Sequence, residues 1–296
     1  MNIKDLEYFH QLVLEKNFSK VATYFNVSQP TITLAIKRLE EEFQTPLFER
    51  DRSHKKLHVT LAGQQLEQHV SLILNELTLA KKEVLRTKEE KLLFGLPPII
   101  GNYFFPTIVT HLISSGLIAQ FHTTEAGSDA LLKLLLDGSI DFCLLGSLEP
   151  LTQRALNAET FASTEFKIIV SKKHPLAQKK AVHFAELKNE QFIVHNEGFI
   201  HDKALRLLAR HNHFTPDIIY QTNYVHVLKS MVQSNTGIAC LSEIALSPND
   251  DLAVLDLLDE DRPKFLLSIV MRSNQVLTPT KEKLLQILRE SVYQNK

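Results

Sequence analysis

Polar and basic side chains at the start of one expected helix have the chemistry needed to read nucleic acid. Ser28 can cap a helix, and Pro30 is tolerated in the first turn because its missing N–H costs little there. The side chains able to hydrogen-bond base edges or phosphates follow at short spacing: Gln29, Thr31, Thr33 and Lys37. A helix in the major groove of DNA reads bases with side chains near its start. The spacing therefore predicts a groove-reading helix, with the acidic residues 40–42 at its far end.

Basic residues cluster again just beyond this helix. Residues 50–56 hold four of them against one aspartate: Arg50, Arg52, Lys55 and Lys56. Apolar and polar residues then alternate over 57–60, as in a strand, so the segment resembles a two-stranded wing able to grip the phosphate backbone. A small helical subdomain with a solvated charge run is the alternative, and the helix patterns alone leave both open.

Three short helices, of which the reading helix is the last, are expected in residues 1–45. Apolar residues at helical spacing line one face of each: Leu6, Phe9, Leu12 and Val13, then Val21, Ala22 and Phe25, then Ile32, Ile36, Leu39 and Phe43. Ser19 is the expected cap of the second helix. Asn26 and Val27 form a short turn between the second and third helices, which is the helix-turn-helix pattern.

Residues 61–91 predict one long helix, because no Gly or Pro lies between Gln64 and Phe94. Its apolar residues are spaced alternately by four and three, which makes a heptad seam: Leu66, Val70, Ile73, Leu77, Ala80 and Val84. An exposed seam of this kind predicts helix–helix dimerisation, and packing against the chain's own domain is the alternative. The charged residues 88–91 mark a linker into the next domain.

The charge-free stretch 92–124 is the only candidate for a membrane span. It runs for 33 residues without Asp, Glu, Lys or Arg, but prolines and glycines interrupt it throughout. A spanning helix needs about 20 continuous apolar residues. The stretch therefore predicts a buried strand, a turn and a core helix.

From residue 92 onward, short apolar strands alternate with helices, which predicts α/β units with mostly parallel sheets. The expected strands are 91–96, 119–124, 141–146, 165–171, 191–195, 218–221, 237–241 and 266–272. Residues 131–146 and 227–242 echo each other, each an apolar helix that ends at a glycine (Gly138, Gly237) before a buried strand, which suggests two similar lobes. Cys143 and Cys240 fall in these strands and are expected to be small core residues rather than nucleophiles.

The chain holds no pattern of catalytic or metal-binding residues. The G-x-S-x-G, G-x-G-x-x-G, Walker A and H-E-x-x-H motifs are absent. His211 and His213 are the only close histidine pair and lack a third ligand, so they predict surface residues. The acidic stretch 249–261 lacks the spacing of a calcium loop and predicts a solvated connection. We therefore expect no catalytic residue, no metal and no cofactor.

The sequence resembles the LysR-type transcriptional regulators over its whole length. The resemblance is most specific in IKDLEYFHQLVLEKNFSKVATYFNVSQPTITLAIKRLEEEFQTPLFERD and VTLAG, and continues through DGSIDFCLLG, VSKKHPLA and NTGIACL. It implies an N-terminal all-α winged helix-turn-helix, a long linker helix that dimerises, and a C-terminal α/β effector domain with two lobes, like periplasmic binding proteins. The implied domains are 1–60, 61–90 and 91–296, with lobe I at about 91–161 and 267–296 and lobe II at about 162–266. A dimer, or a homotetramer built as a dimer of dimers, is the implied assembly.

Ten residues are expected to contact DNA once the resemblance is carried over position by position and the basic run is added. They are Ser28, Gln29, Pro30, Thr31, Thr33, Lys37, Arg50, Arg52, Lys55 and Lys56. Thr33 stands where the family usually has Ser, which keeps the hydroxyl. Leu34 and Ala35 lack the polar groups common in the family at their positions, and the wing is about two residues longer than the family's.

For the effector, the resemblance implies a small molecule in the cleft between the lobes. The matching residues are Pro98, Ile100, Gly101, Asn102, Thr124, Gly127, Ser128, His195, Asn196, Phe199, Thr222 and Asn223. Strand carboxyl ends and helix N-termini favour anionic ligands, with Asn102 and Ser128 able to cap helices and His195 able to add positive charge. For each residue, an ordinary role in a turn is the alternative. Within the family, the chain resembles the regulators of malolactic fermentation, which makes malate a candidate effector.

The formal net charge of -1 first suggests a protein that does not bind nucleic acid. Within residues 1–60, however, basic charge gathers at 37–38 and 50–56, and the acidic residues 40–42 only cancel it in the sum. The charged N-terminus is not a secretory signal, so the expected location is the cytoplasm. Expected partners are double-stranded promoter DNA, a small carboxylate effector and further copies of the chain; RNA polymerase is a candidate, and no membrane is expected. The alternative function is a small-molecule-binding or enzymatic α/β protein whose first 90 residues serve only oligomerisation.

Overall fold

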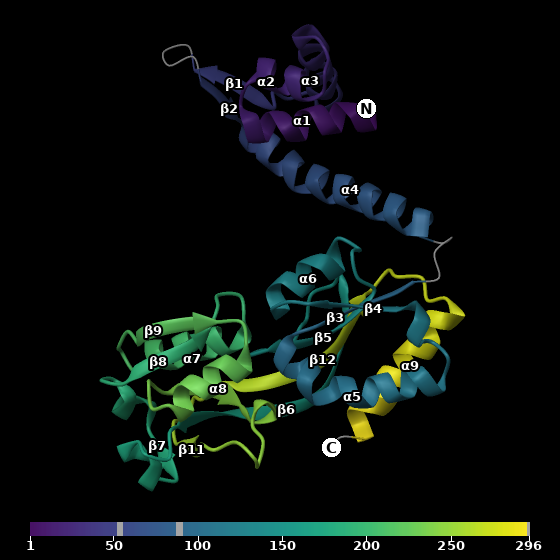
Figure 1. Ribbon diagram of the computed structural model, residues 1–296. Coiled ribbons are helices and arrows are strands. Elements are labelled where there is room, and N and C mark those ends of the chain that lie inside the picture. The colour runs from purple at the N-terminus through teal and green to yellow at the C-terminus, as the bar shows by residue number, and fades with distance from the viewer. Residues whose placement is uncertain (52–55, 87–90, 295–296) are drawn as a thin grey trace. The chain divides into compact units, whose positions relative to one another are not determined.

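The computed structural model describes residues 1–51, 56–86 and 91–294 and divides the chain into two compact units, Met1–Lys88 and Glu89–Lys296 (Figure 1). The first unit contains the helices α1 (Ile3–Glu15), α2 (Phe18–Tyr24) and α3 (Gln29–Phe43), the strands β1 (Phe48–Asp51) and β2 (Lys56–Val59), and the helix α4 (Leu61–Arg86). The predicted short helices, hairpin and long helix are therefore confirmed.

The starts of α2 and α3 differ in detail from the prediction. The side chain of Asn17 accepts hydrogen bonds from the backbone N–H groups of Ser19 and Lys20 at 3.0 and 3.1 Å. The prediction that Ser19 caps α2 is wrong, because asparagine caps as well as serine and Asn17 comes first. Ser28 does precede α3 at the cap position, but its hydroxyl bonds the Thr31 hydroxyl at 2.8 Å.

The core of the first unit is formed by the inner faces of its helices. Phe9, Val21, Ile32 and Leu39 are fully buried there, as their helical spacing predicts. The prediction for Phe43 is wrong, since 42% of this residue is exposed. It is the last residue of α3, one turn beyond Leu39, where the core has already ended.

A single carboxylate joins α3 to the hairpin. Strands β1 and β2 pair antiparallel, from Phe48 opposite Val59 to Asp51 opposite Lys56. Oε1 of Glu40, in the last turns of α3, accepts from the backbone N–H groups of Leu47 and Phe48 at 2.8 and 3.3 Å. The acidic run therefore has a structural role, because it fixes where the hairpin begins.

Some apolar residues of α4 pack against the core of the first unit, and others are exposed. Ala62, Leu66, Val70 and Leu74 pack against the core of the first unit. Further along the predicted seam, Ile73 and Val84 are exposed, Val84 at 69%. Packing within the chain's own domain thus accounts for the first half of the helix, and dimerisation along the second half stays a prediction.

The second unit alternates strands and helices, as predicted (Figure 1). Its strands are β3 (Leu92–Leu96), β4 (Phe121–Glu125), β5 (Phe142–Ser147), β6 (Leu156–Val170), β7 (Ala181–Val182), β8 (Gln191–His195), β9 (Asp217–Thr222), β10 (Ala239–Ser242), β11 (Ala253–Leu257) and β12 (Lys264–Arg272). Its helices are α5 (Pro98–Ser114), α6 (Ser128–Leu136), α7 (Ile200–His211), α8 (Val225–Gln233) and α9 (Pro279–Gln294), with one-turn helices at Ile118–Gln120, Pro175–Gln178, Phe184–Leu187 and Glu243–Ala245.

Two long strands connect the two sheet regions of this unit. The strand order is β4-β3-β5-β12-β6-β11-β7, and β10 also pairs with β6. The first half of β6 pairs with β12, and its second half pairs with β10 and β11, all antiparallel. The expectation of mostly parallel sheets is therefore wrong for these pairs, although β3-β4, β3-β5 and β8-β9 are parallel. The chain returns through β6 and β12 instead of making every connection through a crossover helix.

The charge-free stretch forms β3, α5 and the start of β4, as predicted for a buried segment. Helix α5 accommodates Pro106 in its interior and packs against α9, where His111 Nδ1 lies 2.9 Å from the Ser291 hydroxyl. No helix in the described ranges is both long and apolar enough to cross a membrane.

The two echoing helix–strand segments end differently. Gly138 follows α6 with φ of 74°, the left-handed conformation expected of a glycine after a helix. After α8, however, Asn235 takes this conformation, with φ of 59°. Gly237 is required for another reason: a Cβ atom there would lie 2.7 Å from the carbonyl oxygen of Gln191. The predicted role of Gly237 is therefore wrong.

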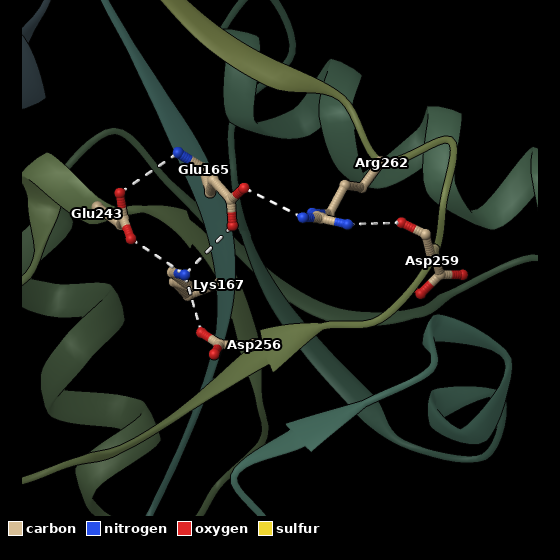
Figure 2. Close-up of polar contacts among 6 residues, drawn as sticks. All are labelled: Glu165, Lys167, Glu243, Asp256, Asp259 and Arg262. Atoms are coloured by element: carbon tan, nitrogen blue, oxygen red, sulfur yellow. Dashed lines mark hydrogen bonds and ion pairs between the residues drawn. The ribbon is translucent and has the colours of Figure 1, made fainter.

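An ion-pair cluster surrounds Lys167 on β6 (Figure 2). Its Nζ lies 2.8 Å from Asp256, 3.0 Å from Glu243 and 3.4 Å from Glu165. Burial lowers the pKa of Lys167, but these hydrogen bonds outweigh it and raise the pKa overall. Arg262 also binds Glu165, at 3.2 Å, and lowers the pKa of that carboxyl group. The stretch 249–261 is thus not only a solvated connection, because it contains strand β11 and the ion-paired Asp256.

Candidate functional site

The exposed face of α3 presents the predicted DNA-reading residues. Gln29, Thr33 and Lys37 follow one another at intervals of four residues, so they lie in one row along the helix, and all three are exposed. Gln29 Nε2 donates to the Thr33 hydroxyl at 3.2 Å, and Lys37 pairs with Glu41 at 3.5 Å. These weak surface contacts leave the side chains available to a ligand.

The neighbouring positions of α3 differ from one another. Leu34 is 56% exposed on the same side, whereas Ala35 is fully buried and packs in the core. Pro30 is exposed, and Thr31 is half-buried beside Ser28. Leu34 can therefore contact DNA only through apolar groups, and Ala35 cannot contact DNA directly.

The predicted wing exists as a hairpin, but its basic side chains are not described. Arg50 and Lys56 belong to β1 and β2. Their side chains, together with the whole of Arg52 and Lys55, lie outside the described residues. Their contacts with DNA stay a prediction.

Sequence reasoning missed an ion pair that holds the reading helix. Asp5 of α1 is buried and receives two hydrogen bonds from Arg38 of α3, at 2.5 and 3.2 Å. The resulting short contacts hold the pKa of Arg38 above its usual range. An aspartate on the apolar face of α1 was the signal available in the sequence.

In the second unit, four described helices that follow strands begin without a side-chain cap. Within the described residues, no side chain caps α5, α6, α7 or α8, whose cap positions are Pro97, Gly127, Phe199 and Tyr224. Unpaired N–H groups and the helix dipole give each start a partial positive charge. These ends can therefore stabilise an anion without a basic side chain.

Two of the predicted segments lie against each other. A Cβ atom on Gly127 would lie 2.8 Å from the carbonyl oxygen of Gly198 and 3.4 Å from the ring of Phe199. Lys203 of α7 and Asp129 of α6 form an ion pair at 2.7 Å beside this contact. The loops that precede α6 and α7 are thereby brought together, as predicted for residues 124–128 and 195–199.

His195 occupies the end of β8 but does not carry the positive charge that was expected. It is 1% exposed, and this burial lowers the pKa of its imidazole to about 4. Its Nδ1 lies 3.0 Å from the carbonyl oxygen of Thr222, and its ring stacks on Phe199 with centroids 5.2 Å apart. The histidine is therefore neutral at physiological pH.

Two predicted helix caps are also wrong. The Ser128 hydroxyl accepts from the backbone N–H of Gly146 at 3.1 Å, and Gly127 is the cap residue of α6. Asn102 lies in the second turn of α5, which begins earlier, at Pro98. Its side chain is exposed.

The remaining predicted effector residues divide between the surface and the interior. Ile100 and Gly101 are buried in α5; the Ile100 side chain packs in the core, and a Cβ atom on Gly101 would lie 2.9 Å from the side chain of Leu96. The Thr222 hydroxyl accepts from the backbone N–H of Tyr224 at 3.1 Å. The other predicted positions are half-buried or exposed: Pro98, Thr124, Asn196 and Asn223. Ile99, in the first turn of α5, packs in one core cluster with Ile193 of β8, two residues before His195.

Residues at the end of β5 and on the connecting strands were missed. A Cβ atom on Gly146 would lie 2.2 Å from the ring of Phe265, which itself lies 5.1 Å from the ring of His201. The Ser147 and Thr164 hydroxyls are buried, and the described residues offer neither a hydrogen-bond partner. Buried polar groups normally have one, so they mark a place for a ligand or water.

The described parts of the chain contain neither a metal-binding cluster nor a reactive thiol. They contain no group of three His, Cys, Asp or Glu residues that could hold a metal ion, and His211 and His213 are exposed. Cys143 and Cys240 are buried free cysteines, and burial raises the pKa of both thiols, that of Cys240 to about 12. The prediction that they are core residues is confirmed.

Comparison with known proteins decides the family. Residues 3–64 match the bacterial regulatory helix-turn-helix protein of the lysR family, and residues 86–292 match the LysR substrate binding domain. The chain belongs to the LysR family. It is accordingly a DNA-binding transcriptional regulator with an effector-binding domain. LysR proteins are regulators rather than enzymes, so the alternative of an enzymatic α/β protein is wrong.

Relatives and solved structures agree with the LysR assignment. The chain is 35% identical over 290 residues to the malolactic fermentation system transcriptional activator of Lactococcus lactis, covering 98% of each chain. A mutant of OxyR from Corynebacterium glutamicum has the same fold, with a TM-score of 0.56 at 19% identity over 99% of this chain and 93% of that one. The effector binding domain of QuiR in complex with shikimate matches 69% of this chain and 97% of its own, with a TM-score of 0.60 at 13% identity.

Proposed function

We propose that this LysR regulator reads its operator with the exposed row of α3 and grips the flanking phosphates with the wing. The observation that carries the proposal is the row of Gln29, Thr33 and Lys37 at the start of an exposed helix. Ser28, Pro30 and Thr31 flank the row and position it against the backbone. Arg50, Arg52, Lys55 and Lys56 supply the charge that neutralises phosphates.

The test is binding of the purified chain to duplexes from its own upstream region. Affinity should fall steeply with salt, because each neutralised phosphate contributes a slope of about -0.9 in log K against log salt concentration. Gln29→Ala should reduce the binding free energy for the preferred duplex by roughly 1–3 kcal/mol and change the binding to random DNA little. Lys56→Ala should weaken both equally and reduce the salt slope by about one. Gln153→Ala, at an exposed position in the other unit, is the matched control.

We also propose that a small organic anion binds between lobe I (about 91–161 and 267–296) and lobe II (about 162–266). Support comes from the uncapped starts of α5, α6, α7 and α8 and from the contact between the loops before α6 and α7. Malate is the first candidate, because the Lactococcus relative is a malolactic fermentation activator. A ligand that binds only the native chain raises its melting temperature, so a thermal-shift screen of organic acids tests this. The absence of any shift across the screen would contradict it.

Self-association is proposed through α4. The exposed part of the seam, including Ile73 and Val84, is suited to pairing with a second copy, and a dimer of dimers is the further candidate. This assigns residues 1–60 to DNA binding and 61–90 to dimerisation. RNA polymerase is proposed as a partner at the promoter, in the cytoplasm. Sedimentation of Ile73→Glu against the exposed control Leu136→Glu tests the interface, since only the first should shift the chain towards monomer.

A further inference from the structure

The protonation of His195 can be assigned from its partner. Its Nδ1 lies 3.0 Å from the carbonyl oxygen of Thr222. A carbonyl oxygen only accepts, so Nδ1 must carry the proton and donate. A neutral imidazole has one N–H, and Nε2 is therefore an unprotonated acceptor. This atom is buried, and no described residue donates a hydrogen bond to it.

Among the described residues, the surroundings of the ring supply no donor for Nε2. The ring stacks on Phe199, with an angle of 19° between the planes, and meets His201 at 67°. Nε2 of His201 is engaged by the Ser242 hydroxyl at 2.9 Å, and burial lowers the pKa of His201 well below its usual value. The charge of Asp202 acts on His195 by raising its pKa, and this carboxylate is bound by Arg206 at 2.8 Å. An acceptor buried without a partner costs about 1–3 kcal/mol.

Contacts of the His195 ring and of Nδ1 connect this residue to three uncapped helix starts. The Phe199 ring, at the cap position of α7, contacts both His195 and the position of Gly127, which begins α6. Thr222 joins the imidazole to α8, because its carbonyl accepts from Nδ1 and its hydroxyl from the N–H of Tyr224. The helix starts attract an anion, whereas the lone pair of Nε2 repels one and attracts a donor.

We propose that His195 selects an effector with a hydroxyl group beside its carboxylate, whose O–H donates to Nε2. This inference rests on the proposed binding of an organic anion between the lobes. The carboxylate is held by the N–H groups that begin the helices, and the hydroxyl supplies the donor that the imidazole lacks. An ammonium group could also donate, but its charge is repelled by the same helix starts. The effector class is therefore a hydroxy acid rather than a simple acid or an amino acid.

The experiment compares acids that differ at one carbon. Succinate, malate and aspartate carry hydrogen, hydroxyl and ammonium at that carbon, and propionate with lactate and tricarballylate with citrate extend the comparison to other sizes. Calorimetry with the full chain should show a hydroxy acid binding at least about fivefold more tightly than its matched simple acid, the lower limit for pairing a buried acceptor. The preference should be the same at pH 6 and pH 8.

Two variants assign the preference to His195. His195→Phe removes the acceptor and should bring each hydroxy acid to within about twofold of its simple acid, whereas His195→Gln offers an amide oxygen and should keep part of the preference. His211→Phe, at an exposed histidine of α7, is the control and should keep all of it.

The outcomes separate this inference from the effector proposal. Binding of none of these acids overturns the proposed organic anion and the inference with it. Equal binding of matched acids, preference for aspartate, or a preference retained in folded His195→Phe overturns the inference alone. Tighter binding of simple acids at pH 6 than at pH 8 also overturns it, because a protonated His195 would then act as a cation.

Discussion

Replacing Lys167 by Met should destabilise the effector domain measurably. The substitution keeps the apolar stem and removes the ammonium group that three carboxylates share, at 2.8, 3.0 and 3.4 Å (Figure 2). The three carboxylates are between 36 and 62% exposed, so each pair is treated as a screened surface pair of about 0.2–1 kcal/mol. Only 12% of the lysine side chain is exposed, which favours the upper part of that range. The expected loss is about 1–3 kcal/mol.

Urea unfolding of the full chain can be followed by pulsed hydrogen exchange and mass spectrometry. These methods measure the unfolding of β6 and β11 separately from that of the DNA-binding helices. For a slope of about 2–3 kcal/mol per molar urea, the midpoint for these strands should fall by roughly 0.3–1.5 M. The control is Lys172→Met, in the turn two residues beyond the end of β6, because its pair with Asp251 is exposed at 63 and 79% and should contribute almost nothing.

Repeating the unfolding measurements in high salt tests whether the effect of Lys167→Met is electrostatic. In 1 M NaCl the Debye length is about 3 Å, so the difference between the original chain and Lys167→Met should shrink. If Lys167→Met unfolds at the same urea concentration as Lys172→Met, or if its deficit is unchanged in high salt, the electrostatic account of this cluster is wrong.

Three further results are expected. Because the folded pKa of His195 is about 4 against the usual 6.5, the unfolded chain binds the extra proton between these values, and His195 should make stability rise with pH there by up to about 1.4 kcal/mol per pH unit. His195→Gln should reduce the slope of the pH profile measured by urea unfolding and leave the part that the buried His201 contributes, and an unchanged slope would contradict the neutral assignment. Gly146→Ala should lower the free energy of unfolding by about 1–3 kcal/mol, because the new Cβ atom would lie 2.2 Å from the Phe265 ring. Adding Phe265→Leu should restore part of the lost melting temperature, and no recovery would show that this contact is not the source of the strain. Cys143 and Cys240 should resist Ellman's reagent in the native chain and react after unfolding, so rapid native reaction would disagree with their burial.

The periodic features of the sequence predicted the elements well. Apolar spacing located the four helices described in the first unit, and the basic run with the alternating residues after it located the hairpin. Short apolar runs located most strands of the second unit, but not the first half of β6. Strand β11 was missed because its exposed residues, such as Val254 and Asp256, interrupt the apolar run within an acidic stretch. Its presence depends on pairing with β6, which no local pattern reveals.

Site chemistry was harder to predict, because it depends on what surrounds each side chain. His195 was expected to be a cation, yet its environment of Phe199, His201 and the Thr222 carbonyl keeps it neutral. Ser128 was expected to cap a helix, but Gly146, from a distant strand, supplies its partner. Burial and long-range contacts of this kind follow from the tertiary fold, which residue type and spacing do not specify.

The carboxylate of Glu40 has a consequence for how the regulator searches DNA. It accepts hydrogen bonds from the two N–H groups that begin the hairpin, so it holds the start of β1 against α3. Its negative charge, beside Glu41 and Glu42, also weakens attraction to phosphates in general. A protein that binds DNA of random sequence less tightly dissociates from it sooner. We therefore expect the domain to stay for a shorter time on the rest of the genome and to sample candidate operators faster.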